Sequence, residues 1–529
     1  MRMRTVTGAL AVAGMVSVPA VNQAMAQDGA TLINARCGVC HEERADGTRN
    51  RISDARKTPE AWGMTLTRMV NIHGLKLTGD EHRTLVAYLS NTQGLAPSES
   101  KGYRYVLEKT PGVTDVGPTD NLTQFCGRCH TFARVALQRR TKEDWLKLVH
   151  FHLGQFPTTE YQALGRDRDW WGGASTTVVD ELAKLLPFES DAWTNWKGKA
   201  APDLSGGWRF TGHRPGAGDY AGLATLSANG KGGYDITTKA TYADGNVEEA
   251  TGAVVVYSGH EFRASLKGKN GASMRVVMST GGNADTLTGR WFVRDNDVIG
   301  GTINSARQGG AARILAVQPA YIKHGETTKI TIHGTGLAGD VSLGSNLKFS
   351  EVDRSADSVT LEVTADAGAA TGARDVAVGG TSSAGALVVY DKVDSVKVVP
   401  DTTIARVGGN GGPIAPVPAQ FEAVGYMAGA DGKAGTEDDV RIGVMPASWS
   451  TANFDETAEA LKDKDFAGKI TGVGLFEPAG AGPNPARPMS TNNAGNLSVI
   501  GVVDDGGNKV EGKAHLFVTV QRFVDPPIR

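Results

Sequence analysis

The sequence predicts a multidomain fold in which a mainly helical amino-terminal region is followed by three antiparallel β-domains. Three observations support this prediction. The chain has 529 residues, which at about 150 residues per domain implies several domains. Before residue 200, apolar residues recur at helical spacing. After residue 200, short stretches alternate between apolar and polar residues and are separated by glycine-rich turns, as in antiparallel β-sheets.

Composition excludes several classes of protein. The formal net charge is −2 and 21% of the residues are charged, which argues against a disordered chain and against a strongly basic nucleic-acid-binding protein. The 4 cysteines are too few for a disulfide-dense scaffold of this length. We therefore expect folded domains and no nucleic-acid partner.

The first 26 residues have the pattern of a cleavable export signal. A basic start at Arg2 and Arg4 precedes a short apolar run at residues 8–21, and Ala24-Met25-Ala26 matches a small-residue cleavage site. Polar residues interrupt the apolar run, which is too short for a membrane anchor. We expect a signal peptide at residues 1–26 and no membrane span in the mature chain.

The helical region contains two copies of the motif Cys-x-x-Cys-His, at residues 37–41 and 126–130. This motif is the attachment signature of c-type haem, because two thiols about one helical turn apart reach the two porphyrin vinyl groups and the adjoining histidine points at the iron. It predicts covalent attachment through Cys37, Cys40, Cys126 and Cys129, with His41 and His130 as the proximal iron ligands.

Two other interpretations of the four cysteines explain less. A zinc site has similar ligand spacing, but it leaves the histidine after each cysteine pair unexplained. A dithiol redox motif needs a βαβ context, and the sequence shows no such context here. The motifs therefore favour two haem c groups.

Each iron also needs a distal ligand, commonly Met or His in electron-transfer sites. Residues 58–62 and 141–145 resemble each other, and both open a helical pattern with threonine at the cap, glutamate in the first turn and tryptophan at the end. Counting seven residues from each tryptophan gives Met69 and His152. This register predicts Met69 as the distal ligand of the first haem and His152 as that of the second.

The sequence also allows other distal ligands. Glu81 and Glu160 each lie eight residues after a histidine, and aligning them makes His73 the ligand of the first haem. The remaining candidates are Met64 and His82 for the first haem and His150 for the second. Because a Met ligand raises the haem potential relative to a second His, unlike sites would give electrons a preferred direction.

Two further features complete the helical region. Thr78 and Glu81 begin a helical run whose apolar face is expected to pack on the first haem. Four arginines follow the start of the second motif, at positions 128, 134, 139 and 140. They could contact haem propionates, but a solvated basic face is the preferred interpretation.

The β-region divides into three units. Alternating strands from residue 208 to 304 indicate a barrel or a sandwich, and the unit that starts near Arg313 resembles an immunoglobulin-like module of the IPT type. In the last unit, the acidic loop Asp431–Asp439 could bind calcium, but its order is not that of an EF-hand and a solvated turn is preferred.

The predicted domains are a signal peptide at 1–26, a dihaem cytochrome c domain at 27–198, an antiparallel β-barrel at 199–311, an immunoglobulin-like β-sandwich at 312–391 and a β-sandwich at 392–529. The chain has no nucleophile elbow, phosphate-binding loop, metalloprotease motif or dinucleotide fingerprint. We therefore predict electron transfer and assign no catalytic residue to this chain.

This layout resembles the alpha-subunit family of quinohemoprotein amine dehydrogenases. The resemblance covers residues 27–529 and depends on the two haem motifs together with the long β-region. It implies a periplasmic heterotrimer with a β-propeller subunit and a small gamma subunit. The gamma subunit carries cysteine tryptophylquinone, which oxidises primary amines to aldehydes and ammonia. The implied role of this chain is to pass electrons from that quinone through two haems to azurin or a soluble cytochrome c.

Other functions stay open at this point. A stand-alone dihaem cytochrome c, or the cytochrome subunit of another periplasmic dehydrogenase, has the same haem chemistry without amine oxidation. A dihaem peroxidase would leave one iron five-coordinate. An optical spectrum distinguishes a relay with two low-spin haems from a peroxidase with one high-spin haem.

Overall fold

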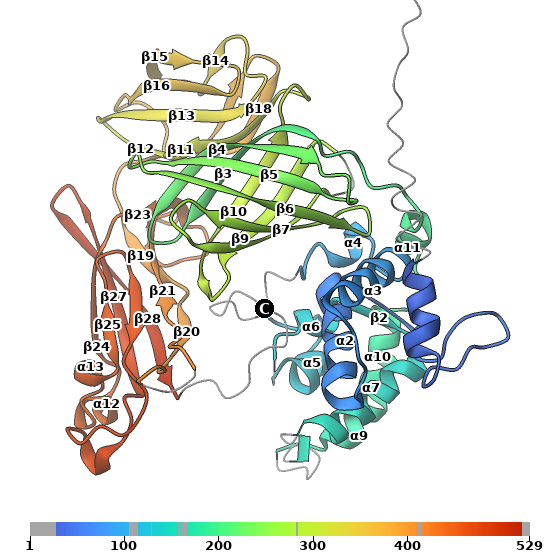
Figure 1. Cartoon of the computed structure of the whole chain (residues 1–529). Coiled ribbons are helices and arrows are strands. Elements are labelled where there is room, and N and C mark those ends of the chain that lie inside the picture. The colour runs from blue at the N-terminus through green and yellow to red at the C-terminus, as the bar shows by residue number, and fades with distance from the viewer. Residues whose placement is uncertain are drawn as a thin grey trace, which may run out of the picture.

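The computed structural model describes residues 28–104, 115–128, 130–156, 159–160, 167–281, 284–410 and 414–520. The predicted signal peptide and Cys129 lie outside the described residues. A helical unit is followed by an eight-stranded barrel and two further β-units (Figure 1). This confirms the predicted order of a helical region followed by β-domains.

The helical unit is built from short helices and one small two-stranded sheet. Its elements are η1 (Ile33–Cys37), β1 (Ala55–Lys57), α2 (Pro59–His73), α3 (Gly79–Thr92), α4 (Pro97–Ser100), α5 (Asp120–Leu122), η2 (Thr123–Gly127), α6 (Ala133–Ala136), β2 (Gln138–Arg140), α7 (Lys142–Gln155), α9 (Trp170–Ser175), α10 (Thr177–Leu185) and α11 (Asp191–Trp196). The helices predicted after Thr58, Thr78 and Thr141 are present, and at Thr78 a capping box with Glu81 fixes the first turn.

The helical unit contains two structurally related halves. Strand β2 starts 83 residues after β1, and α7 starts 83 residues after α2. β1 and β2 pair antiparallel, and Arg56 of β1 faces Arg139, the residue at the equivalent position of β2. Antiparallel pairing of equivalent positions indicates that an approximate two-fold axis relates the two halves. The sequence similarity of the two segments therefore extends to their structure.

The second unit is a closed antiparallel barrel. Its strands are β3 (Gly206–Arg214), β4 (Gly218–Ala228), β5 (Tyr234–Tyr242), β6 (Val247–Tyr257), β7 (Glu261–Gly268), β8 (Ser273–Ser279), β9 (Thr286–Val293) and β10 (Asn296–Arg307). Each strand pairs with the next along the chain, and β10 pairs with β3 to close the barrel. The strand pattern allowed a barrel or a sandwich, and the structure shows a barrel.

The third unit consists of two four-stranded sheets around one apolar core. Its strands are β11 (Arg313–Gln318), β12 (Tyr321–Lys323), β13 (Thr327–Thr335), β14 (Val341–Ser342), β15 (Leu347–Arg354), β16 (Ser358–Ala365), β17 (Gly372–Val378) and β18 (Thr381–Tyr390). The sheet orders are β11-β13-β16-β15 and β12-β18-β17-β14. Fully buried Ile330, Leu361 and Val389 lie in the core between them.

In its described residues, the fourth unit combines three small sheets with two short α-helices and one 3-10 helix. Its elements are β19 (Ser395–Val399), β20 (Thr402–Arg406), β21 (Ala419–Gln420), β22 (Glu422–Met427), β23 (Val440–Met445), β24 (Ser448–Asn453), α12 (Glu456–Ala460), α13 (Asp463–Phe466), β25 (Gly468–Ile470), β26 (Leu475–Pro478), η3 (Pro488–Ser490), β27 (Gly495–Asp505) and β28 (Asn508–Thr519). The longest hairpin, β27–β28, lies in the sheet β20-β28-β27-β24.

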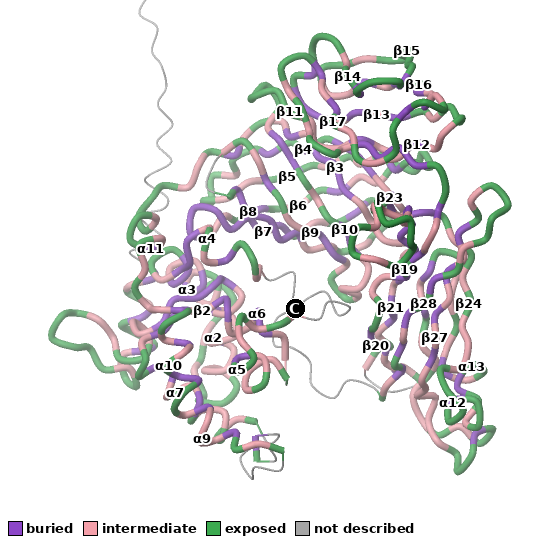
Figure 2. The backbone as a smooth tube through the Cα atoms, turned by 180° about the vertical axis from the view of Figure 1, so that it is seen from behind, coloured by how far each residue is buried: buried purple, intermediate pink, exposed green. Residues whose placement is uncertain are grey.

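The barrel is the unit that contacts all the others. The turn between β6 and β7 lies against α3 and α4 of the helical unit (Figure 2), where Ser258 donates to the carbonyl of Ser90 at 2.6 Å and His260 contacts the carbonyl of Leu95 at 2.9 Å. On the third unit, His333 lies 2.8 Å from the guanidinium of Arg209. The helical unit and the third unit are therefore both fixed to the barrel by direct contacts.

His213 joins the barrel to the fourth unit. Its Nδ1 lies 2.6 Å from a carboxylate oxygen of Asp219 in β4, and its Nε2 lies 2.5 Å from a carboxylate oxygen of Glu422 in β22. Burial lowers the pKa of His213, but hydrogen bonds to both carboxylates and their negative charges outweigh burial and raise the pKa to about 10.

The positive charge of His213 is expected to stabilise this junction at neutral pH. Its contribution is full below the ordinary pKa of 6.5, declines as the pH rises, and is lost as the pH passes about 10. We expect His213→Ala to lower the free energy of unfolding at pH 6 by about 1–2 kcal/mol, which is less than hydrogen bonds to charged groups contribute in a buried site because solvent screens this partly exposed one. Chemical denaturation at pH 6 and pH 10 measures this. A difference that is equal at both pH values would contradict it.

No helix in the described ranges is long and apolar enough to cross a membrane.

Candidate haem sites

The first motif forms one turn of helix that places both thiols and the histidine close together. The amide of Cys40 donates to the carbonyl of Cys37 at 3.2 Å, and the amide of His41 donates to the same carbonyl at 2.9 Å. Cys37 is buried, Cys40 is exposed, and neither forms a disulfide. The Nδ1 of His41 lies 2.9 Å from the carbonyl of Asn50. A hydrogen bond there leaves Nε2 available to a metal.

The second motif has similar features in the part that the structure describes. Cys126 lies in η2 and is half-buried. The Nδ1 of His130 lies 2.9 Å from the carbonyl of Thr131, which again leaves Nε2 available. Burial lowers the pKa of His130 and outweighs its hydrogen bond to Thr131, so the ring is neutral at pH 7, as a metal ligand must be.

Each motif packs against the helix on which its distal ligand is predicted. Cys37 belongs to an apolar cluster that includes Trp62 and Leu66 of α2 together with residues of α3. Cys126 packs against a second cluster that includes Trp145 and Val149 of α7. The first motif and α2 therefore form one site, and the second motif and α7 form another.

The candidates on α2 differ in burial. Trp62 and Leu66 are buried, and Met69 follows them on the same face at helical spacing. Met69 is half-buried, whereas His73, the last residue of the helix, is exposed. Met64 and His82 are also half-buried, and His82 on α3 faces α2 near Gly63. All four candidates therefore belong to the same two helices.

On α7, the two histidines lie on different faces. Trp145 and Val149 are buried, and His152 continues their face. His152 is half-buried and its Nδ1 lies 2.7 Å from the carbonyl of Leu148. His150 is exposed and its ring contacts Trp171, with the ring centroids 4.9 Å apart. The geometry thus brings His152, and not His150, to the side of the helix that carries the apolar cluster.

Met69 and His152 occupy equivalent positions in the two halves, because each lies ten residues after the first residue of its helix. The two helices also meet at equivalent positions. The guanidinium of Arg68 on α2 lies over the ring of Phe151 on α7, 4.5 Å from the ring centroid. The residues that precede Met69 and His152 are therefore in contact across the approximate two-fold axis.

Basic side chains gather between the halves; Lys57, Arg68 and Arg140 are called the cation cluster here. Lys57 and Arg140 end β1 and β2, and they are 4% and 5% exposed. Each lies over the tryptophan of the following helix. Lys57 Nζ is 4.5 Å from the ring centroid of Trp62, and the guanidinium carbon of Arg140 is 5.6 Å from that of Trp145. The sequence repeat has thus produced two equivalent cation–aromatic contacts.

The cation cluster contains more positive than negative charge in the part of the chain that the structure describes. Arg140 forms an ion pair with buried Asp144, whereas Lys57 Nζ donates to the neutral hydroxyl of Thr65 at 2.9 Å. Burial lowers the pKa of Lys57 well below its ordinary value, and the charges of Arg140 and Arg68 lower it further against the effect of Asp144. Burial also lowers the pKa of Arg68 to about 10. Asp144 therefore balances only part of the positive charge of the cluster.

Two buried donors also lack an acceptor: Nε of Arg68 in the cluster and Nε1 of Trp145 next to it have no hydrogen-bond partner among the described residues. Trp145 is 1% exposed. Trp62, the equivalent residue of the first half, donates its indole N–H to the carbonyl of Gln93 at 3.1 Å. Buried donors without an acceptor are unusual in folded proteins. Carboxylates of a haem would supply both acceptors and negative charge, so these residues fit that group.

Sequence reasoning did not identify Lys57, Arg68 or Trp145 as candidates. The available signal was the repeat itself, since a pair of basic residues precedes the capping threonine in both halves.

The structure corrects the preferred interpretation of two arginines. Arg139 and Arg140 are not on a solvated face: both are buried, and Arg139 lies 3.4 Å from Glu99. They are buried because β1 and β2 pair at the centre of the unit. Arg128 does lie at the surface, where it pairs with Asp167 at 2.7 Å.

The acidic loop of the fourth unit uses its carboxylates internally. Asp438 accepts hydrogen bonds from Thr436 and from the amide of Asp431, and Asp439 accepts one from the amide of Gly435 at 2.8 Å. Among the described residues, no three His, Cys, Asp or Glu side chains are grouped to hold a metal ion.

Three of the solved structures that match this chain are remotely similar to it. A de novo designed fluorescence-activating β-barrel is 23% identical over 21% of this chain and 97% of its own, with a TM-score of 0.18. A redesigned β-barrel bound to DFHBI is 15% identical over 20% and 94%, with a TM-score of 0.18. A γ-CGTase from alkalophilic Bacillus clarkii is 11% identical over 88% and 63%, with a TM-score of 0.16. No curated protein matches the chain.

Comparison with protein families is decisive. Residues 27–193 match the family described as quinohemoprotein amine dehydrogenase A, alpha subunit, haem binding. Residues 201–308, 311–391 and 396–528 match domains II, III and IV of the same alpha subunit. The four matches follow the four units of the structure and cover nearly the whole chain. The chain therefore belongs to the quinohemoprotein amine dehydrogenase alpha-subunit family.

Proposed function

We propose that this chain is the electron-transfer subunit of a periplasmic quinohemoprotein amine dehydrogenase and that it carries two haem c groups. The observation that carries this proposal is the internal duplication of the helical unit. Each half contains one attachment motif packed against a helix with a candidate ligand at the same position. A duplicated site accounts for two haems in one domain.

The residues of each half have defined roles in this proposal. Cys37 and Cys40 hold one haem, and Cys126 and Cys129 hold the other. His41 and His130 bind the irons through Nε2, because their Nδ1 atoms face backbone carbonyls. Met69 and His152 are the distal ligands, with His73 and His150 as the alternatives. The haems supply reversible one-electron chemistry.

The cation cluster holds and orients haem carboxylates in this proposal. Lys57, Arg68 and Arg140 provide positive charge, and the indole of Trp145 provides a further donor. Because the cluster lies where the halves meet, it holds the haem carboxylates of both sites in the same region. The two haems also have different distal ligands, which gives electrons a preferred direction between the halves.

The catalytic quinone is assigned to a partner. The resemblance to the family implies that a cysteine tryptophylquinone on a small gamma subunit oxidises the amine and that a β-propeller subunit completes the heterotrimer. Azurin or a soluble cytochrome c accepts the electrons. For the third unit we propose an immunoglobulin-like fold of the IPT type, which its pair of four-stranded sheets supports.

The experiment that tests the proposal is purification of the native complex from the periplasm. We expect the chain to copurify with a small quinone-staining subunit, and the complex to reduce azurin or cytochrome c when a primary amine is added. The chain alone should contain haem and show no amine oxidation. Amine oxidation by the isolated chain, or the absence of a quinone-bearing partner, would overturn the assignment.

Removing one attachment motif should remove one haem. For Cys37→Ser combined with Cys40→Ser, we expect one covalent haem per chain in place of two, because the first porphyrin loses both thioether bonds. Intact mass under denaturing conditions and the pyridine haemochrome assay both count covalent haem. Ser53→Ala, a change in the same half outside the motif, is the control and should retain two. Zinc in place of porphyrin in the unaltered protein would contradict the prediction.

A further inference from the structure

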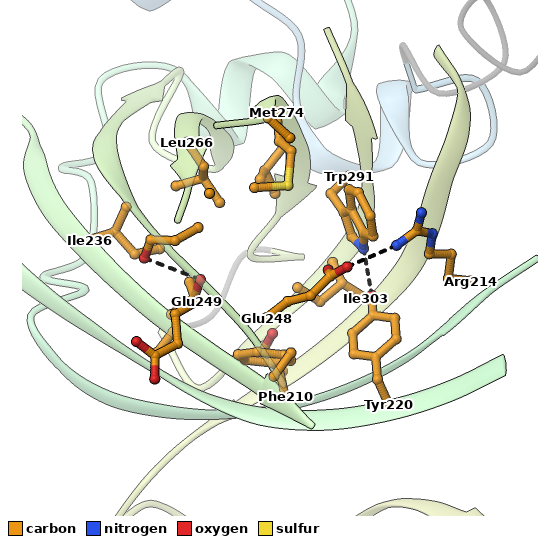
Figure 3. Close-up of a pocket in the computed structure, with 18 of the residues that line it drawn as sticks. Phe210, Arg214, Tyr220, Ile236, Glu248, Glu249, Leu266, Met274, Trp291 and Ile303 are labelled. Carbon is orange, nitrogen blue, oxygen red and sulfur yellow. Dashed lines mark hydrogen bonds and ion pairs between the residues drawn. The ribbon is translucent and has the colours of Figure 1, made fainter. Parts of the chain in front are cut away.

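The barrel encloses a cavity of about 400 Å³ that none of the roles above uses. Figure 3 shows it bordered by apolar and aromatic side chains from most strands of the barrel, among them Ile236, Leu266, Met274 and Trp291. Cavities of this size and composition are typical of sites for small molecules. Eight strands also make a barrel that side chains can just fill or that holds one small ligand.

Small side chains keep the cavity open. Ala224 in β4, Ala240 in β5 and Ala250 in β6 all line it. These three neighbouring strands thus place methyl groups where larger side chains would fill the interior. An apolar cavity that stays empty is unfavourable in proportion to its volume, so alanines on three adjacent strands are better explained by an occupant than by packing alone.

The two ends of the cavity differ. At the end that contacts the helical unit, Trp208 and Phe262 lie where β3 and β7 start, and both are fully buried in the barrel core. At the other end, Arg214, Tyr242 and Glu248 lie where β3 and β5 end and β6 begins. Tyr242 is buried, whereas the side chains of Arg214 and Glu248 are only partly buried. A ligand would therefore enter past the polar end and rest against the aromatic end.

The charged side chains that line the polar end are paired, and besides the residues above these include Lys269, which forms an ion pair with Glu249. Arg214 donates to a carboxylate oxygen of Glu248 at 3.0 Å, and the hydroxyl of Tyr242 donates to the other oxygen at 3.0 Å. Nearby, Trp291 donates to the hydroxyl of Tyr220 at 2.8 Å. Burial raises the pKa of Tyr242 to about 12, so its hydroxyl stays neutral. A charged ligand would find no unpaired opposite charge among these residues.

We propose that the barrel is a binding site for an uncharged, mostly apolar molecule that fits within about 400 Å³. The apolar walls supply affinity through burial of the ligand surface, and the polar end, whose charged side chains are paired, gives an uncharged ligand an advantage over a charged one of the same shape. This function is separate from electron transfer and does not depend on the haem assignment.

Two probes with a shared body test the proposal. N-phenylnaphthylamine is neutral, and anilinonaphthalene sulfonate adds one sulfonate to the same rings. Equilibrium dialysis against the haem-loaded native protein, with the free probe measured by fluorescence in the protein-free chamber, avoids absorption by haem. We expect saturable binding of the neutral probe at one site per chain and at least tenfold weaker binding of the sulfonate. Absence of saturable neutral binding, or equal affinity for both probes, would overturn the proposal.

Filling the cavity locates the site. Ala224→Leu with Ala250→Leu adds bulk inside the barrel and should weaken binding of the neutral probe at least tenfold. Thr225→Leu with Thr251→Leu is the matched control, because these neighbours are exposed, and it should bind as the native protein does. The filled variant should also unfold at the same or a higher temperature, since the new side chains enter free space. Unweakened binding, or a large fall in unfolding temperature, would contradict the cavity as a site.

Discussion

Replacing Met69 with histidine is expected to lower the reduction potential of the first haem by a few tenths of a volt, within the range of about 0.8 V that axial ligands span. A thioether ligand favours the reduced iron relative to a second imidazole. In Met69→His both haems would have two histidine ligands, and their potentials would converge. Spectroelectrochemical titration measures both potentials, and loss of the methionine–iron charge-transfer band reports the ligand change directly.

The alternative ligands supply the controls. His73→Ala removes the candidate that a gapped alignment favours, and His150→Ala removes the exposed histidine on α7. Both variants should keep two low-spin haems with unchanged potentials. If His73→Ala converts the first haem to a high-spin form while Met69→His leaves its potential unaltered, the ungapped register is wrong.

The reciprocal change tests the second site. His152→Met should raise the potential of the second haem, so that both sites have a thioether ligand. Met69→His and His152→Met combined in one chain should reverse the order of the two potentials. That result would show that the ligands, and not the surroundings of the two halves, set the direction of electron transfer.

Parts of this molecule could be predicted from sequence because their signals are contiguous. A haem attachment motif needs its five residues in a row, since one helical turn must present both thiols and the histidine. The helices after Thr58 and Thr141 were predictable for a similar reason, because a cap, an acidic first turn and periodic apolar residues are all local. The repeated tryptophans then related Met69 to His152 without knowledge of the fold.

Other parts depend on contacts between distant segments. Closure of the barrel requires β10 to pair with β3, and the alternating pattern of each strand is the same in a barrel and in a sandwich. The burial of Arg140 follows from the pairing of β1 with β2, and two-residue basic segments are ordinarily exposed. Local patterns therefore predicted the helices that carry the candidate ligands, but not the burial of the charged residues between them.

The cation cluster is expected to be a determinant of potential. Lys57→Met removes a buried positive charge while nearly keeping the length of the side chain. Positive charge near an iron favours its reduced form, so this variant should lower the potential of the adjacent haem by tens of millivolts. That is the size of the effect of a unit charge about 10 Å away at an effective dielectric constant of about 20. Lys142→Met is the control, since Lys142 is exposed and paired with Asp180.

Stability distinguishes the two accounts of this cluster. If no anion is present, replacing the desolvated amino group of Lys57, whose pKa burial lowers well below its ordinary value, by an apolar side chain should be neutral or stabilising. If haem carboxylates occupy the cluster, Lys57→Met leaves a buried carboxylate short of one partner, and the haem-loaded protein should lose several degrees in unfolding temperature. A lower potential together with a lower unfolding temperature therefore supports bound carboxylates. An unchanged potential with a higher unfolding temperature would show that the cluster serves another purpose.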